Sequence, residues 1–152
     1  MGVALEQADL ARLSDEVPVG AVVVKQNQII AVGRNKPITT SDPTAHAEIV
    51  AIRKAAEKIG NYRLLDTQLY VTLEPCAMCA GAIVNARVKR VVFGARDNRA
   101  GAGGSVFDIL DSRELNHRVV ITEGVRELEC RQKLTTFFLS KRKERGNGIV
   151  GN

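Results

Sequence analysis

Residues 68–94 read QLYVTLEPCAMCAGAIVNARVKRVVFG and contain the pattern that decides the fold. A β-branched run, QLYVTL, precedes the helical segment PCAMCAGAIVNAR, and a second apolar run, VKRVVFG, follows it. Proline suits the first turn of a helix because the N–H that it lacks would have no partner there. The order strand, helix, strand predicts a helix packed on neighbouring strands of an α/β domain.

The segments on the N-terminal side extend this pattern. VGAVVV (19–24) and QIIAVGR (28–34) are β-branched runs separated by three polar residues, which predicts a hairpin. Residues 44–59 have apolar positions at helical spacing, with Asp42 or Thr44 available as the N-cap. A weaker amphipathic pattern over residues 5–13 predicts a short first helix.

The C-terminal side begins with a glycine-rich loop, GAGGS (101–105). VFDIL (106–110) is interpreted as one or two helical turns, RVVIT (118–122) as a strand, and residues 125–143 as a last helix. Together the segments predict a three-layer α/β/α fold whose five-stranded sheet is mixed because it begins with a hairpin. We expect a single domain over residues 1–145 and a disordered tail over 146–152.

Composition and charge narrow the class of protein. The chain has 152 residues, 45% of them hydrophobic, and a net charge of +5. No apolar run approaches the length of a bilayer span and the N-terminus lacks a signal pattern, so we expect a cytoplasmic protein that does not contact membranes. Positive charge is concentrated in residues 87–99 and 141–145, which suits a polyanionic partner, although either block alone is equally typical of a solvated surface.

Three cysteines do not form a disulfide framework, so metal or thiol chemistry is expected of them. His46, Cys76 and Cys79 offer an imidazole and two thiols, a ligand set that zinc prefers. Three protein ligands leave the fourth tetrahedral position open for catalysis. Cys130 and His117 are the alternatives for closing a structural site, but Cys130 lies on an apolar helix face and His117 in a loop, so we favour the open site.

The Cys76-x-x-Cys79 spacing alone is also compatible with a redox motif. His46 favours the metal interpretation, and both sulfurs are expected at the N-terminus of a helix, where the dipole stabilises thiolates. Glu48 is then predicted to act as a proton carrier for a water activated by zinc. Residues two apart on a helix point about 200° apart, so His46 and Glu48 converge only if the metal lies off the helix end. The alternative is a core histidine beside a solvated first-turn acid.

HAE (46–48) followed by PCAMC (75–79) matches the H-x-E…P-C-x-x-C signature of zinc-dependent deaminases. Together with EVPVGAVVV, GRNKP, DPTAHAEIVAIR and LNHRVVITEG, these motifs resemble those of the bacterial tRNA-specific adenosine deaminases, over residues 16–138. The resemblance implies a cytidine-deaminase-like fold and a homodimer with one zinc ion per subunit. It also implies hydrolytic conversion of the wobble adenosine of a tRNA anticodon, chiefly that of an arginine tRNA, to inosine.

The matching positions carry roles over to individual residues. The resemblance implies that His46, Cys76 and Cys79 hold zinc and that Glu48 moves protons. It further implies that Asn35 contacts the flipped base, and that Asp97 and Asn116 lie along the path of the anticodon loop. From the residues alone, Asn35 is interpreted as a turn former at the end of a strand, Asp97 as a turn acid and Asn116 as a loop hydrogen-bonding residue. At least one of Phe137 and Phe138 is expected to face the core, and the basic turns after them are a candidate phosphate surface.

Two other functions compete with this hypothesis. A deaminase of a small nucleobase or nucleoside, such as cytosine, cytidine or guanine, would have the same zinc signature. The basic surface favours a polymeric substrate such as a tRNA anticodon stem-loop. A zinc-stabilised RNA-binding module without catalysis would not need Glu48.

Overall fold

The computed structural model describes residues 1–147. The elements are α1 (Gly2–Leu13), β1 (Gly20–Lys25), β2 (Gln28–Arg34), α2 (Pro37–Thr40), α3 (Ala47–Ile59), β3 (Thr67–Leu73), α4 (Ala77–Asn85), β4 (Arg90–Ala95), β5 (Val120–Thr122) and α5 (Glu127–Asn147). The five strands form one sheet in the order β2-β1-β3-β4-β5. β1 is antiparallel to β2 and β3, whereas β4 is parallel to β3 and β5. The predicted five-stranded mixed sheet is confirmed.

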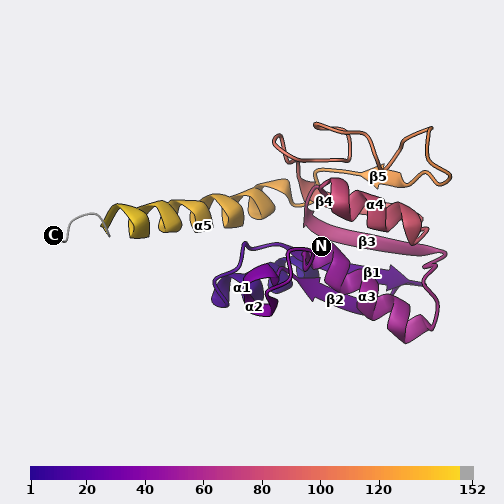
Figure 1. Cartoon of the computed structure of the whole chain (residues 1–152), viewed down its shortest axis with the longest axis horizontal. Helices are drawn as coiled ribbons and strands as arrows, with labels where there is room; N and C mark the ends of the chain where they lie inside the picture. Colours follow the sequence, from indigo (N-terminus) through magenta and orange to yellow (C-terminus); the bar gives the residue numbers. More distant parts are fainter. Residues whose placement is uncertain (148–152) are drawn as a thin grey trace.

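Helices cover both faces of this sheet (Figure 1). α3 and α4 contact each other on one face, and α1 and α5 contact each other on the other face. Apolar side chains of the strands and of α3 and α4 form the main core, with Leu69, Val71, Ile83 and Phe93 among its fully buried members. The three-layer α/β/α prediction is therefore confirmed.

Small residues let the helices approach the strands closely. A Cβ atom at Gly33 of β2 would lie 2.3 Å from the carbonyl oxygen of Ala47, in the first turn of α3. A Cβ atom at Gly20 of β1 would lie 1.9 Å from the carbonyl oxygen of Ala4 in α1. Any side chain at Gly33 would push the start of α3 away from the sheet.

The hairpin between β1 and β2 turns over two residues with positive φ, Gln26 (52°) and Asn27 (60°). This is the backbone of a type I′ turn, whose twist matches that of the flanking strands. The predicted hairpin is confirmed, with an irregularity in its register between Val23 and Val24.

The start of α3 differs from the prediction. The helix begins at Ala47 with His46 as its N-cap residue, not at Thr44. Asp42 instead accepts hydrogen bonds from the backbone N–H (2.8 Å) and the hydroxyl (2.7 Å) of Thr44. This Asx turn competes with helical hydrogen bonding and delays the helix by one turn.

The prediction of a helix in residues 106–110 is wrong. The backbone N–H groups of Val106 and Phe107 both donate to the carbonyl oxygen of Gly101, at 3.0 Å each. Gly103 pairs with Asp108 in an isolated antiparallel bridge. The backbone of this segment therefore closes a compact loop on the GAGGS stretch, and its donors are not available for a helix.

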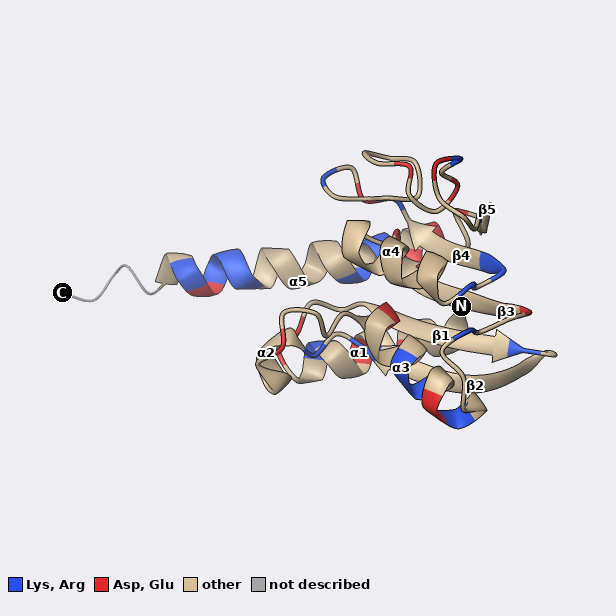
Figure 2. Ribbon diagram, turned by 45° about the vertical axis from the view of Figure 1, so that its right-hand side comes forward, with Lys and Arg blue, Asp and Glu red and all other residues tan. Residues whose placement is uncertain are grey.

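The last helix runs further than residue 143. α5 begins at Glu127 and includes Gly146 and Asn147, which were predicted to belong to a disordered tail. The rest of that predicted tail, residues 148–152, lies outside the described residues. The C-terminal half of α5 extends away from the sheet (Figure 1), and Lys and Arg residues gather on its last turns (Figure 2). Within residues 1–147, no helix is long and apolar enough to cross a membrane.

Candidate zinc centre and the α5 groove

Three ligand-type side chains converge where α3 and α4 begin. His46 Nδ1 lies 3.6 Å from Cys76 Sγ and 3.5 Å from Cys79 Sγ, and all three atoms lie within 4.8 Å of one another. Zinc bonds of about 2.3 Å to sulfur and 2.0–2.1 Å to nitrogen at tetrahedral angles place the two atoms about 3.6 Å apart. The observed distances therefore fit one tetrahedral zinc ion held by His46, Cys76 and Cys79.

Each ligand is positioned by a helix terminus. His46 is the N-cap residue of α3 and has an extended backbone (φ −70°, ψ 155°). Cys76 is the N-cap residue of α4, and Cys79 lies in the first turn of that helix. Pro75 consequently lies one residue outside α4 rather than in its first turn. The positive ends of two helix dipoles meet at the cluster and favour negative charge on the thiols.

Without metal, the two thiols share one proton. The hydrogen bond from the Cys79 thiol is the main cause that lowers the pKa of Cys76 to about 4, and His46 also lowers it. The same hydrogen bond, together with burial, raises the pKa of Cys79 far above its ordinary value. The cluster thus presents one thiolate before metal arrives, and zinc binding would displace the second proton.

Glu48 lies in the first turn of α3, next to this cluster, and is buried with 4% of its surface exposed. Burial is the main cause that raises its pKa to about 7, while the charge on His46 opposes the rise. The expected 200° divergence from His46 does not occur, because His46 has an extended backbone and precedes the helix. A carboxyl group that titrates near neutral pH can both accept and return a proton.

The backbone of α3 is capped by another predicted site residue. Asn35 is buried, and its side-chain oxygen accepts a hydrogen bond from the N–H of Ala47 at 2.8 Å. Asn35 follows β2 directly, and the N–H of Lys36 donates to the carbonyl oxygen of Ala45. The structure thus brings Asn35 to the residue between His46 and Glu48.

Asp97 and Asn116 are placed differently. Asp97 follows β4, and its side chain accepts hydrogen bonds from the N–H groups of Arg99 (2.9 Å) and Ala100 (3.2 Å). Asn116 accepts a hydrogen bond from the Arg87 guanidinium at 2.9 Å. Because Arg87 follows the C-terminal end of α4, Asn116 lies at the opposite end of that helix from Cys76. The structure does not bring Asn116 to the metal cluster.

The two alternatives for a fourth ligand lie elsewhere. The sulfur of Cys130 is buried against Gly94, where an added Cβ atom would lie 2.3 Å from it. His117 forms a hydrogen bond through Nε2 with the carbonyl oxygen of Val88, at 2.8 Å. Neither residue belongs to the cluster of His46, Cys76 and Cys79.

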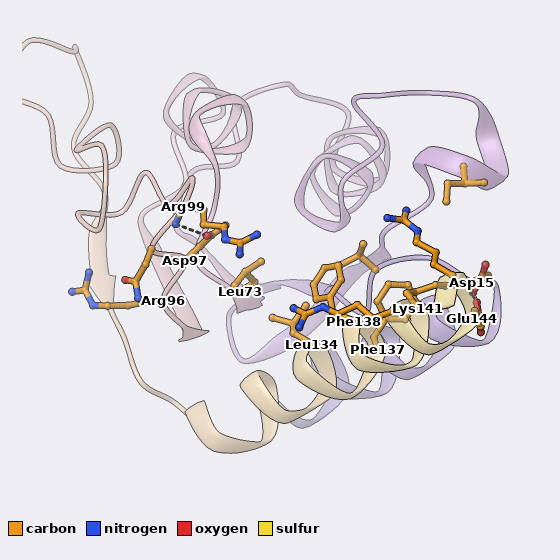
Figure 3. A pocket seen from close by; sticks show the side chains of 15 residues that line it. Asp15, Leu73, Arg96, Asp97, Arg99, Leu134, Phe137, Phe138, Lys141 and Glu144 are labelled. Atoms are coloured by element: carbon orange, nitrogen blue, oxygen red, sulfur yellow. Dashed lines mark hydrogen bonds and ion pairs between the residues drawn. The ribbon is translucent and has the colours of Figure 1, made fainter. Parts of the chain in front are cut away.

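A cavity of about 1000 Å³, which we call the α5 groove, opens beside Asp97 (Figure 3). Its walls come from the loop between α1 and β1, α2, the end of β3, the loop after β4 and residues 134–145 of α5. Phe137 is buried and Phe138 is 45% exposed in this groove, so the prediction that one of them faces the core is confirmed. The cations that line it are Arg96, Arg99, Lys141, Arg142 and Arg145. Three acids, Asp15, Asp97 and Glu144, also line it, so the groove combines a small excess of positive charge with an exposed aromatic ring.

Sequence reasoning missed two buried acids near this region, Glu16 and Glu74. Glu16 accepts hydrogen bonds from the N–H (2.7 Å) and hydroxyl (2.9 Å) of Thr39 and so holds α2 in the wall of the groove. Glu74 accepts four hydrogen bonds from the loop after β4. The position of Glu74 two residues before Cys76 was the signal available in the sequence.

The mixed sheet and the His-Cys-Cys cluster define a deaminase. The family model described as MafB19-like deaminase matches residues 1–142. A curated tRNA-specific adenosine deaminase from Haemophilus influenzae is 55% identical over 95% of this chain and 84% of its own length. The chain belongs to the family of the tRNA-specific adenosine deaminases and is therefore a hydrolytic enzyme.

Solved structures of deaminases are also similar to this chain. A structure from work on tRNA:A34 deaminases that edit the wobble position has a TM-score of 0.86 at 42% identity, and covers 88% of this chain and 97% of its own. A guanine deaminase from Nitrosomonas europaea has a TM-score of 0.77 at 25% identity, with coverages of 90% and 81%. The fold is therefore similar to that of enzymes whose substrates differ in size.

Proposed function

We propose that the chain converts adenosine at the wobble position of a tRNA anticodon to inosine, with an arginine tRNA as the substrate. The observation that carries the proposal is the buried Glu48 beside three ligands at tetrahedral zinc distances. The family, whose curated members are named tRNA-specific adenosine deaminases, supports the substrate class. A tRNA substrate also implies a cytoplasmic reaction.

The proposed mechanism is hydrolytic. Water adds to C6 of adenine, its protons pass through Glu48 to the ring nitrogen and to the leaving amine, and ammonia departs. Zinc held by His46, Cys76 and Cys79 would supply the acidity that makes water nucleophilic near neutral pH. A pKa of about 7 for Glu48 in the metal-free protein shows how strongly burial favours its protonated form, which is the form that donates to the amine.

Substrate contacts are proposed for Asn35 and Asp97. Asn35 uses its oxygen to cap α3, so its amide N–H₂ group is the part left for a base. Asp97 lines the α5 groove beside Arg99, where an RNA strand leaving the active site would meet cations and the Phe138 ring. For Asn116, the proposed contact would be at the far end of α4, and so with a more distant part of the tRNA. The active form is proposed to be a homodimer.

The second candidate is a deaminase of a small base, which the similarity to a guanine deaminase supports. The positive α5 groove favours the RNA, because a free base carries no phosphate for its cations to bind. To distinguish the two substrate classes, zinc-loaded protein is incubated with an anticodon stem-loop that carries adenosine at the wobble position. Free adenosine, cytidine and guanine are tested in parallel. Inosine from the stem-loop alone, measured by mass spectrometry after digestion, supports the proposal. Product from a free base or nucleoside alone would show that the substrate is a small molecule and not RNA.

The matched control is Glu48→Gln. An enzyme loses turnover on this change, whereas a binding module without catalysis keeps its function. The choice of tRNA is tested by comparing stem-loops of arginine tRNA and of other tRNAs that carry adenosine at the wobble position. Equal rates on all of them would contradict the arginine assignment.

A further inference from the structure

Glu74 is a buried acid at the end of β3 that no cation neutralises directly among the described residues. One carboxylate oxygen accepts hydrogen bonds from the N–H of Asp97 (2.9 Å) and from the hydroxyl of Ser105 (2.5 Å). The other accepts from the N–H groups of Gly103 (3.0 Å) and Ser105 (3.1 Å). Only 1% of the residue is exposed. Four donors from one loop therefore replace the water that this carboxylate would otherwise bind.

The loop over residues 97–105, which we call the Glu74 loop, is shaped to enclose this carboxylate. A Cβ atom at Gly101 would lie 2.4 Å from the carboxyl carbon of Glu74. A Cβ atom at Gly103 would lie 3.4 Å from the side chain of Glu74. The glycines of the GAGGS stretch thus let the backbone approach the carboxylate to hydrogen-bonding distance.

Glu74 joins this loop to the ligand segment. It precedes Pro75 and Cys76, and Cys76 pairs with Gly101 in an isolated antiparallel bridge. The N–H of Ala102 donates to the carbonyl oxygen of Pro75 at 2.7 Å. The carboxylate and these two backbone contacts hold the loop against the segment that carries the first cysteine ligand.

The same loop supplies part of the α5 groove. Asp97, Asn98 and Arg99 line the groove, and Figure 3 shows Asp97 and Arg99 at its edge. Arg96 donates to the Ser105 hydroxyl at 2.9 Å and forms an ion pair with Glu123, after β5. The anchored loop therefore links the ligand segment, the groove edge and the neighbouring strand end.

We propose that Glu74 is a positioning residue that sets where Asp97 and Arg99 stand relative to Cys76, and thereby governs RNA binding at the groove edge rather than the chemical step. This inference rests on the proposed function for its kinetic consequence. Glu74 touches neither the cluster atoms nor the groove, so its effect passes through the loop backbone. Removing its charge leaves four loop donors facing a weaker acceptor, because an amide offers one oxygen where the carboxylate offers two.

The test compares the zinc-loaded parent with Glu74→Gln, using Asp111→Asn as the matched control. Asp111 is an exposed carboxylate that pairs with Arg118 in the same stretch between β4 and β5. For Glu74→Gln we expect unchanged zinc content, a KM for the stem-loop RNA raised about tenfold and a kcat within about twofold of the parent. The control is expected to match the parent in all three quantities.

A second readout does not depend on catalysis. Trypsin cleavage after Arg99, followed by mass spectrometry, measures how often the Glu74 loop opens. Glu74→Gln is expected to speed this cleavage by about tenfold, and Asp111→Asn to leave it unchanged. If Glu74→Gln does not fold, Ser105→Ala removes one anchoring donor and is expected to produce the same two changes by about threefold.

Loss of zinc from Glu74→Gln would overturn the inference, because the residue would then act on the metal site itself. A KM and a cleavage rate equal to those of the parent would also overturn it. If the parent does not deaminate the stem-loop at all, the proposed function has failed, and the cleavage rate then decides alone whether Glu74 positions the loop.

Discussion

The side-chain oxygen of Asn35 accepts a hydrogen bond from the N–H of Ala47 at 2.8 Å, so the end of β2 caps the helix that carries Glu48. The contact joins residues 12 positions apart and orients the first turn of α3 against the sheet. His46 and Glu48 flank Ala47. The Asn35 amide thus helps to place Glu48, the proposed proton carrier, in addition to its own proposed contact with the base.

Asn35→Ala is expected to lower the free energy of unfolding by about 1 kcal/mol, because the N–H of Ala47 loses its cap. Asn35→Asp keeps an acceptor oxygen and is expected to retain most of that stability while losing the N–H₂ group proposed to contact the base. Urea unfolding measures the first effect, and kcat/KM on the stem-loop the second. Full activity of Asn35→Asp would contradict the contact with the base.

Glu48→Gln is expected to reduce kcat by at least about 100-fold, since a general acid–base group contributes that much or more. Zinc content and RNA affinity should stay close to those of the parent, because the amide is nearly isosteric and is not one of the three proposed ligands. Single-turnover inosine formation measures the chemical step directly. Turnover within a few-fold of the parent would show that another group carries the proton.

Cys79→Ser and His46→Ala are each expected to lose the bound zinc and all measurable activity. The third cysteine provides the control: Cys130→Ala is expected to keep one zinc ion per chain, because its sulfur packs against Gly94. Atomic absorption measures the zinc content of each variant. Loss of zinc from Cys130→Ala in a folded protein would show that Cys130 is a fourth ligand of the site.

The stability of the metal-free protein should depend on pH through Glu48. Glu48 has a pKa of about 7 in the folded state against an ordinary value of 4.5. Its contribution to stability is fully present below about pH 4.5 and is lost as the pH rises through about 7, by an amount on the order of 3 kcal/mol. Cys76, whose pKa is lowered, changes stability in the opposite direction.

The difference in unfolding free energy between Glu48→Gln and the parent isolates the contribution of Glu48. After removal of zinc by a chelator, the unfolding free energy of the variant should rise relative to that of the parent between about pH 5 and pH 8. Chemical denaturation at several pH values provides the measurement. If this difference in unfolding free energy stays constant across the pH range, deprotonation of the buried Glu48 does not destabilise the fold.

Arg142→Ala and Arg145→Ala are expected to weaken binding of the stem-loop and to reduce the slope of log K against log salt by about 0.7 to 0.9 for each phosphate that the variant no longer neutralises. Both side chains line the α5 groove. Lys58→Ala, in the last turn of α3, removes an exposed cation from another surface and serves as the control. An equal effect of Lys58→Ala would show that net charge, and not the groove, determines affinity.

Much of the site could be predicted from local patterns. Each of the two motifs includes its own helix start, so the ligand types and their proximity to helix N-termini follow from residues close in sequence. The anchor of the Glu74 loop could not be predicted this way, because its donors come from residues 23 to 31 positions away. The failed helix in residues 106–110 has a different cause, since hydrogen bonds to Gly101 and Ala102, five to eight positions back, close a loop and outweigh helix propensity.

The sequence by itself determined which side chains could bind zinc and which acid could move protons, because imidazole, thiol and carboxyl chemistry belongs to the residue type. Only the tertiary structure decided which of them meet. Alternate residues of a strand face opposite sides of a sheet. In β4, Phe93 joins the core with α4, whereas Gly94 lies under Cys130 of α5. The sheet therefore separates the third cysteine from the cluster, and His46, Cys76 and Cys79 remain as the three proposed zinc ligands.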